Sequence, residues 1–319
     1  MSVILDGKIQ DTKLSSSAMG GTEMMRKRLL ENVPSELLGD VAIYFSRPRN
    51  VMDHGQRIKI FYAHDLYNDT ENKILLNRGW KTFDHFVFVS NWQRETYIQA
   101  FGIPYMKTSV IPNAIEKEYV QRLKDKSTIN FIYHTTPHRG LELLYPIFSK
   151  LAEKHDDIHL DVFSSFEIYG WKERDKQYTE LFELLKSHPK ITYHGTKSNE
   201  EVLCALDNTD IFLYPCIWKE TSCIAMLEAI KSGCMVVHPN LGALCETSSA
   251  AMAFTYEYTE DLKEHMRRAY KITDDLINSY RISDVYSVMN KGGEHVNSIG
   301  EYKKKWITLL EHLKNEHKN

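Results

Sequence analysis

The sequence has few of the features that define several large protein classes. Its 319 residues include five cysteines, all in the second half and none in a Cys-x-x-Cys pair, so neither a zinc site nor a disulfide framework is indicated. No apolar run approaches the roughly 18 residues that a membrane span needs. The N-terminal segment MSVILDGKIQ lacks the basic and apolar regions of a secretory signal. We therefore expect a cytoplasmic protein with reduced, mostly buried thiols.

Neither sign of charge is in large excess. The net charge of −3 does not favour nucleic acid as a partner. Residues 1–127 carry 18 Lys and Arg against 15 Asp and Glu, a difference of +3, and residues 128–319 carry 22 against 28, a difference of −6. A charge of +3 permits a peripheral contact with a membrane or another anionic partner without implying one. The aromatic residues of the second half indicate a core rather than a platform for stacking nucleic-acid bases.

Short apolar runs alternate with longer amphipathic segments. The expected strands are SVIL, VAIYF, IKIFYA, HFVFVS and TSVIP in the first half, then INFIYH, IHLDVFS, KITYHG, DIFLYP and CMVVHP. The expected helices include residues 22–32, 91–101, 140–154, 175–187, 199–206 and 221–231. Such alternation indicates an α/β fold with parallel sheets covered on both faces. The length favours two doubly wound domains over one long sheet.

A domain break is expected after the strand segment SVIPNAI. The next residues, EKEYVQRLKDKST, are charged and weakly patterned before INFIYH begins a new strand. We assign residues 1–125 and 126–295 to two Rossmann-like domains, and residues 296–319 to a C-terminal helix that packs back on the first domain. One face of that helix is apolar and carries Trp306, Leu309, Leu310 and Leu313.

The segment YPCIWKETSCIAMLEAIKSGCMVV contains two glutamates, Glu220 and Glu228, with seven residues between them. Glu228 lies inside an apolar helical run, which is an unusual place for a carboxylate. The preceding run DIFLYP is expected to be a buried strand that ends at Pro215. Because open parallel sheets bind ligands at the carboxyl ends of their strands, the glutamates are expected at a binding edge.

A helix from Thr221 would also present unpaired backbone N–H groups, those of Ser222, Cys223 and Ile224, which attract anions. From Thr221 to Glu228 such a helix rises roughly 10 Å, comparable with a diphosphate and one sugar. A nucleotide sugar would place its diphosphate at the helix start, its transferred sugar near Glu220 and its ribose hydroxyls on Glu228. The simpler alternative is that Glu220 caps the helix and Glu228 pairs with a nearby base.

This segment resembles the Glu-x7-Glu signature of family-4 retaining glycosyltransferases, which have the GT-B fold. Four further segments resemble that family in the right order: MGGTEMMRKRLL, VFVSNWQRETYIQAFGIPYMKTSVIPNAI, YHTTPHRGLELL and ITYHGTKSNEEVLCALDNTDIFLYP. Together they cover nearly the whole chain. The resemblance implies transfer of a sugar from a UDP- or GDP-linked donor to a carbohydrate or lipid-linked acceptor, with no metal and no further cofactor. It also implies that residues 1–125 form the acceptor-side domain and that residues 126–295 bind the nucleotide sugar.

The resemblance also implies roles for other residues. Gly20 and Gly21 would let the backbone approach the donor diphosphate at a helix start. Arg139 would clamp phosphate oxygens and stabilise the leaving diphosphate. His64, at the end of a strand, would contact the donor sugar, and Gly195 would let the chain turn near the nucleotide base. Without the resemblance, the glycines would be simple turn residues and Arg139 a surface residue.

One residue departs from the family pattern. The family usually has a lysine at the position of Arg139 and an arginine five residues earlier, where this chain has His134. A histidine is only partly charged near neutral pH, so a second cationic contact is not assured. Two alternatives therefore stay open. One is a catalytically silent protein that binds sugar nucleotides, and the other is a nucleotide-sugar epimerase whose acid and base would have to be His64 and Asp65.

Overall fold

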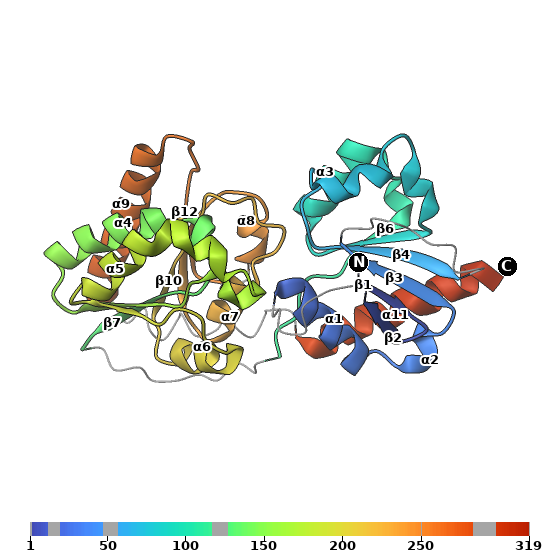
Figure 1. The fold of residues 1–319 in the computed structure, drawn as a ribbon, viewed down its shortest axis with the longest axis horizontal. Coiled ribbons are helices and arrows are strands. Elements are labelled where there is room, and N and C mark those ends of the chain that lie inside the picture. The colour runs from blue at the N-terminus through green and yellow to red at the C-terminus, as the bar shows by residue number, and fades with distance from the viewer. Residues whose placement is uncertain are drawn as a thin grey trace. The chain divides into compact units, whose positions relative to one another are not determined.

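A computed structural model describes residues 2–11, 20–46, 57–116, 127–249, 251–282 and 298–318. The chain divides into two compact units (Figure 1). The first unit comprises Met1–Glu116, Glu220–Ser222 and Asn297–Asn319, and the second comprises Lys117–Lys219 and Cys223–Val296. The domain boundaries expected at residues 125 and 295 lie outside the described residues.

The first unit contains a six-stranded sheet in the order β2-β1-β3-β4-β5-β6. Its strands are β1 (Ser2–Leu5), β2 (Lys8–Asp11), β3 (Val41–Phe45), β4 (Ile58–Ala63), β5 (His85–Phe88) and β6 (Thr108–Val110). Strands β3 to β6 are parallel, as expected, but β1 pairs antiparallel with both β2 and β3. The expectation of an all-parallel sheet was wrong here because Asp6 and Gly7, with φ of 48° and 73°, form a tight turn that creates a hairpin.

The helices of the first unit are α1 (Gly21–Asn32), α2 (Ser35–Leu38), α3 (Asn91–Phe101) and α11 (Ile299–Lys318). Helix α3 has the expected bounds because Ser90 caps its start and Gly102, in the left-handed region, ends it. Helix α11 contacts α1, α2 and β4. Its expected apolar face is buried, namely Trp306, Leu309, Leu310 and Leu313. The core beside the sheet is rich in aromatic side chains, including Phe61, Phe83, Phe86 and Tyr97.

The second unit contains a parallel sheet in the order β12-β11-β10-β7-β8-β9. Its strands are β7 (Ile129–Tyr133), β8 (Ile158–Val162), β9 (Ile191–Tyr193), β10 (Ile211–Leu213), β11 (Met235–Pro239) and β12 (Ala253–Tyr256). The sequence did not predict β12. The chain builds outward from β7 to β9, then returns to β10 and builds in the other direction. The strand order therefore reverses between β7 and β10, where open α/β sheets bind ligands.

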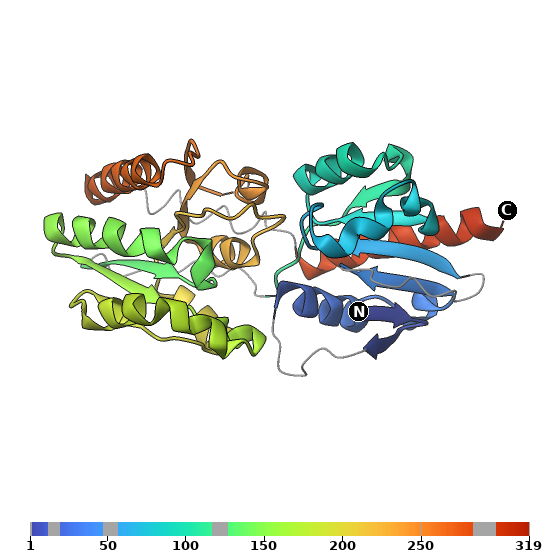
Figure 2. The same ribbon diagram turned by 45° about the horizontal axis from the view of Figure 1, so that its top comes forward.

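The main helices of the second unit are α4 (Leu141–Lys154), α5 (Thr179–Ser187), α6 (Asn199–Leu206), α7 (Ile224–Lys231), α8 (Leu244–Thr247) and α9 (Leu262–Ile282). Helix α4 contacts α5 and α9, whereas α6 contacts α7. Figure 2 shows α9 alongside α4, and Figure 1 shows α6 and α7 on the other side of β7 and β10. Helix α6 has the expected bounds because Ser198 and Glu201 form a capping box. Among the described residues, no helix is both long and apolar enough to cross a bilayer.

Candidate functional site

The loops that follow β7 and β10 touch each other through their backbones. Gly140 has a φ of 125°, and a Cβ atom there would lie 2.3 Å from the carbonyl oxygen of Pro215. On the same side, the Ile217 N–H donates to the Arg139 carbonyl at 3.3 Å. Only glycine fits both the backbone conformation and the space. The sequence pattern indicated Arg139 but not Gly140. The signal for Gly140 was its position in the segment HRGLELL, directly before α4.

Glu228 is buried within α7, with 4% of its surface exposed. The Asn199 side-chain N–H donates to Glu228 Oε1 at 3.0 Å, and His134 Nε2 lies 3.8 Å from Oε2. Asn199 is the first residue of α6, the helix that packs against α7, and His134 directly follows β7. Polar side chains from two other elements thus meet a carboxylate that the sequence places in an apolar run. The sequence pattern did not indicate Asn199.

His134 is a neutral imidazole at physiological pH. Burial lowers its pKa to about 4, and a backbone interaction with Ala225 opposes the shift only in part. The ring also packs against Phe212, with a centroid distance of 5.0 Å. A group with this pKa carries almost no charge near pH 7. The position that resembles the family's arginine therefore supplies no positive charge.

Helix α7 begins later than the sequence predicted. Its first helical residue is Ile224 and its N-cap is Cys223, so Thr221 and Ser222 precede the helix. The helical N–H groups without intrahelical partners are those of Ile224, Ala225 and Met226. The rise from Ile224 to Glu228 is about 6 Å rather than the expected 10 Å. The pair Thr221-Ser222 is a common helix start in sequence, but the extended backbone of Cys223 (ψ 99°) sets the boundary.

Glu220, Thr221 and Ser222 belong to the first unit together with His64. The Thr221 hydroxyl donates to the His64 carbonyl at 2.7 Å, and the Asn113 side-chain N–H donates to the Ser222 carbonyl at 3.5 Å. Glu220 is buried, with 4% of its surface exposed. The structure therefore brings the segment that carries the first glutamate to the backbone of His64.

His64 directly follows β4 and is also neutral. Burial lowers its pKa to about 3. Its ring packs beside Tyr62, with a centroid distance of 4.3 Å, and stacks on Phe45 at 6.1 Å. Within the described part of the chain, His64 Nε2 is buried without a hydrogen-bond partner. Such a nitrogen can accept from or donate to a ligand hydroxyl, but it carries no charge for a phosphate.

The three glycines that the sequence pattern indicated differ in their surroundings. Gly20 is the N-cap of α1 with φ −73° and ψ 167°, and Gly21 is the first residue of that helix. Gly195 follows β9 with a φ of 67°, a conformation that favours glycine. Its neighbour His194 contacts Asp161 through Nε2 at 2.6 Å and stacks on Phe163 at 4.2 Å. Gly195 therefore serves the backbone turn, whereas Gly20 has an ordinary extended conformation.

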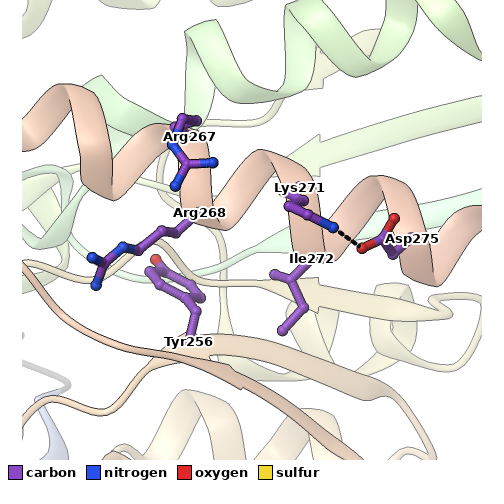
Figure 3. A pocket seen from close by; sticks show the side chains of 6 residues that line it. All are labelled: Tyr256, Arg267, Arg268, Lys271, Ile272 and Asp275. Carbon is purple, nitrogen blue, oxygen red and sulfur yellow. Dashed lines mark hydrogen bonds and ion pairs between the residues drawn. The ribbon is translucent and has the colours of Figure 1, made fainter.

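A separate hollow of about 260 Å³ lies along α9 and is lined by Tyr256, Arg267, Arg268, Lys271, Ile272 and Asp275 (Figure 3). Its three cationic side chains are in ion pairs: Arg267 and Arg268 with Glu264, and Lys271 with Asp275. This makes it a poor site for an anion. Across the described ranges, no group of three or more His, Cys, Asp or Glu side chains is arranged to hold a metal ion.

Comparisons with known proteins identify the family of the chain. The family model "Glycosyl transferases group 1" matches residues 114–287. The chain is 24% identical over 196 residues to a human component of phosphatidylinositol N-acetylglucosaminyltransferase, covering 59% of this chain and 39% of that protein. It is 24% identical over 232 residues to the Saccharomyces cerevisiae GPI3 component of the transferase with the same name, covering 67% of this chain and 50% of that protein.

The chain thus spans half or less of the length of these two curated relatives. Among solved structures, the pneumococcal O-GlcNAc transferase GtfA in complex with UDP and GlcNAc is similar, with a TM-score of 0.61 at 14% identity. That match covers 80% of this chain and 52% of GtfA. At this identity the likeness concerns the fold alone, and it confirms the GT-B fold that the sequence predicted.

Proposed function

Because the chain belongs to the glycosyl transferases group 1 family, we propose that it is a retaining glycosyltransferase. It moves a sugar from a nucleotide diphosphate to an acceptor hydroxyl and needs no metal. The observation that carries this proposal is the edge between β7 and β10. There Gly140 brings the two loops into backbone contact, the Asn199 side chain donates to the buried carboxylate of Glu228, and His134 lies 3.8 Å from it.

The donor would bind along α7. Its diphosphate would meet the N–H groups of Ile224, Ala225 and Met226 and the guanidinium of Arg139, which precedes α4. Glu228, one turn into the helix, would accept hydrogen bonds from the ribose hydroxyls. Gly195 would let the chain turn near the base, and Gly20 and Gly21, at the start of α1, would approach the diphosphate.

The transfer itself would depend on the leaving diphosphate. The bond between the anomeric carbon and the diphosphate oxygen breaks, and the acceptor oxygen bonds to the same face of that carbon. The acceptor proton passes to the departing phosphate oxygen. Arg139 and the α7 amides would stabilise the charge that develops there. Glu220 would orient the transferred sugar, and neutral His64 would hydrogen bond to it through its imidazole.

The relatives suggest the first substrates to test. GtfA was solved with UDP and GlcNAc, and both curated relatives are named as subunits of a phosphatidylinositol N-acetylglucosaminyltransferase. We therefore propose UDP-N-acetylglucosamine as the first donor candidate and phosphatidylinositol as the first acceptor candidate. Since both relatives are named as parts of a larger transferase, a complex with partner proteins belongs to the proposal.

One observation favours a second candidate function. The family pattern has two cationic positions for the diphosphate. In this chain His134 is neutral at one of them, so Arg139 supplies the positive charge of the pattern. Weaker stabilisation of the leaving group would fit a protein that binds sugar nucleotides and does not transfer them. The two candidates differ in whether nucleoside diphosphate is released when an acceptor is present.

A thermal-shift screen of the whole chain tests the donor site first. UDP, GDP, ADP, CMP and their sugar conjugates are compared with and without magnesium. We expect one nucleoside diphosphate to raise the melting temperature equally in both conditions. No shift with any of them would overturn the donor site. Release of that diphosphate in the presence of phosphatidylinositol would then separate transfer from silent binding.

A pair of variants tests the assignment of the two glutamates. Glu220→Ala should abolish transfer and leave the melting shift with nucleoside diphosphate nearly unchanged, whereas Glu228→Ala should weaken that shift. Transfer that survives in Glu220→Ala would refute the role given to Glu220.

A further inference from the structure

The loop between β7 and α4 carries two hydroxyl side chains, Thr135 and Thr136, that the proposed function does not use. Over the ranges that the structure describes, the Oγ1 atoms of both are buried and neither has a hydrogen-bond partner. Thr136 exposes only 6% of its surface. Buried hydroxyls in proteins nearly always have a partner, because an unpaired one costs free energy. Two such hydroxyls on consecutive residues therefore indicate a partner from outside the chain.

The backbone of the same loop, by contrast, is hydrogen bonded. The Thr135 carbonyl accepts from the Ser164 hydroxyl at 2.6 Å. The Thr136 carbonyl accepts from the Tyr133 hydroxyl at 3.1 Å and from the Arg139 N–H at 3.2 Å. These bonds fix the path of the loop through its main chain. A binding loop held in this way loses little conformational entropy when a ligand arrives.

The hydroxyl of Thr136 is not used by local structure either. Thr136 is the N-cap of the short 3₁₀ helix Pro137–Arg139, with an extended backbone (φ −65°, ψ 151°). At an N-cap, a threonine hydroxyl usually accepts a hydrogen bond from a backbone N–H of the first turn. Thr136 makes no such bond. Its hydroxyl therefore keeps its full capacity to donate and to accept.

The two threonines lie on the part of the loop that borders α7. On one side of them in the chain, the ring of His134 interacts with the backbone of Ala225, the second residue of α7. On the other side, Gly140 meets the carbonyl of Pro215, in the loop that precedes α7. The unpaired N–H groups at the start of α7 were proposed above to bind the diphosphate. The hydroxyls thus belong to a segment that contacts this region at both of its ends.

Phosphate oxygens fit these hydroxyls chemically. A hydroxyl donates to an anionic oxygen in a short, strong hydrogen bond, and it brings no charge of its own. The family pattern has a cation at position 134, where this chain has a neutral ring. Hydroxyl donors one and two residues later would replace the lost hydrogen bonds without replacing the charge.

We propose that the hydroxyls of Thr135 and Thr136 donate to phosphate oxygens of the nucleotide diphosphate, in place of the second cation of the family pattern. Rotation about χ1 exchanges a threonine hydroxyl with its methyl group, so a bound phosphate selects the rotamer that faces it. This inference rests on the proposed function for the nucleotide, but binding of the diphosphate can be measured without turnover.

The test is isothermal titration calorimetry of the whole chain with UDP, GDP and inorganic pyrophosphate. Thr135→Val and Thr136→Val replace each hydroxyl with a methyl group of nearly the same size. We expect each variant to weaken the binding of the preferred nucleoside diphosphate, and of pyrophosphate, about fivefold. Thr135→Ser and Thr136→Ser keep the hydroxyl and should stay within about twofold of the original affinity.

The melting temperature of the free protein separates binding from a structural role. Thr136→Val should raise it, because a methyl group replaces a buried hydroxyl that has no partner. Thr273→Val is the matched control, since Thr273 is fully buried in the same unit and its hydroxyl donates to the Ala269 carbonyl at 2.7 Å. That variant should not raise the melting temperature, and it should leave diphosphate affinity unchanged.

Each other result has a definite meaning. Valine variants that bind diphosphate as tightly as the original chain would overturn the proposal and leave the transferase standing. A melting temperature lowered by Thr136→Val as much as by Thr273→Val would also overturn it, because it would reveal a structural partner. Threonine-dependent binding of pyrophosphate without turnover of any sugar nucleotide would uphold the loop and refute the transferase. No binding of any of the three probes by the original chain would overturn both.

Discussion

His64 and His134 occupy corresponding places in the two units. Each is the first residue after a buried parallel strand, β4 in the first unit and β7 in the second. Burial lowers the pKa of both, to about 3 for His64 and about 4 for His134. Their neighbours differ: His64 lies among Phe45 and Tyr62, whereas His134 faces the Glu228 carboxylate at 3.8 Å.

The comparison shows that the groups packed around a buried histidine decide what its side chain can do. A buried histidine among aromatic rings keeps a neutral nitrogen for a ligand hydroxyl. A buried histidine 3.8 Å from a carboxylate is neutral as well, because desolvation outweighs the opposing backbone interaction with Ala225. A protonated histidine could bind a phosphate group through its positive charge. Because both rings are neutral near pH 7, neither of them can do so.

Gly140→Ala should have the largest effect, because it disrupts the contact between the loops that follow β7 and β10 and leaves the surroundings of His64 after β4 unchanged. The new Cβ would meet the Pro215 carbonyl oxygen at 2.3 Å, and φ is 125°. We expect a loss of about 3 kcal/mol of unfolding free energy and loss of nucleotide binding. Gly102→Ala is the matched control, because Gly102 has a φ of 68° and open space around it. It should cost about 1 kcal/mol and spare binding. Equal losses of unfolding free energy in Gly140→Ala and Gly102→Ala, measured by denaturant titration, would contradict the contact between the two loops.

Glu228→Ala should weaken nucleoside diphosphate binding roughly thirtyfold, which is about 2 kcal/mol for hydrogen bonds to a charged group. Isothermal titration calorimetry measures the affinity. Asn199→Ala should produce a smaller loss in the same direction, because it removes the N–H that holds Oε1 at 3.0 Å. An unchanged affinity in Glu228→Ala would place the ribose elsewhere.

Acidification should destabilise the fold through both histidines. Their folded-state pKa values are about 3 and about 4, against 6.5 for the free side chain. The unfolded chain therefore binds more protons below pH 6.5, and stability falls as the pH decreases. At pH 5 each histidine should cost about 2 kcal/mol relative to pH 7. His64→Gln and His134→Gln should each reduce the pH dependence of the unfolding free energy by that amount, and a variant that retains it in full would show that its histidine titrates normally.

The smallest expected effect is that of His134→Gln on nucleoside diphosphate affinity, which tests whether His134 contributes a positive charge to binding. Because His134 is neutral near pH 7, His134→Gln should change nucleoside diphosphate affinity less than about threefold, the scale of one neutral hydrogen bond. Arg139→Ala should weaken it more than about tenfold. A titration near pH 6.5 present in the original chain and lost in His134→Gln would show that His134 binds phosphate as a cation.

Most of the helices and strands could be predicted from local sequence signals. Helices α3 and α6 have the predicted bounds because Ser90, Gly102 and the capping box of Ser198 are such signals. The hairpin of β1 and β2 could also have been found, since Asp6-Gly7 between apolar runs is a hairpin signal. The start of α7 could not, because Thr221 and Ser222 are good helix-start residues held outside the helix by bonds to His64 and Asn113.

For the site, sequence spacing determined that Glu220 and Glu228 lie near the carboxyl end of a buried strand, since chain order and strand pattern are local properties. The structure decided which groups meet them. Asn199 and Gly140 come from segments far from the glutamates in the chain, and their place beside α7 and the β10 loop depends on the order of strands in the sheet. Tertiary burial also decided the charge of His64 and His134, because desolvation depends on the atoms packed around a ring and not on its neighbours in the sequence.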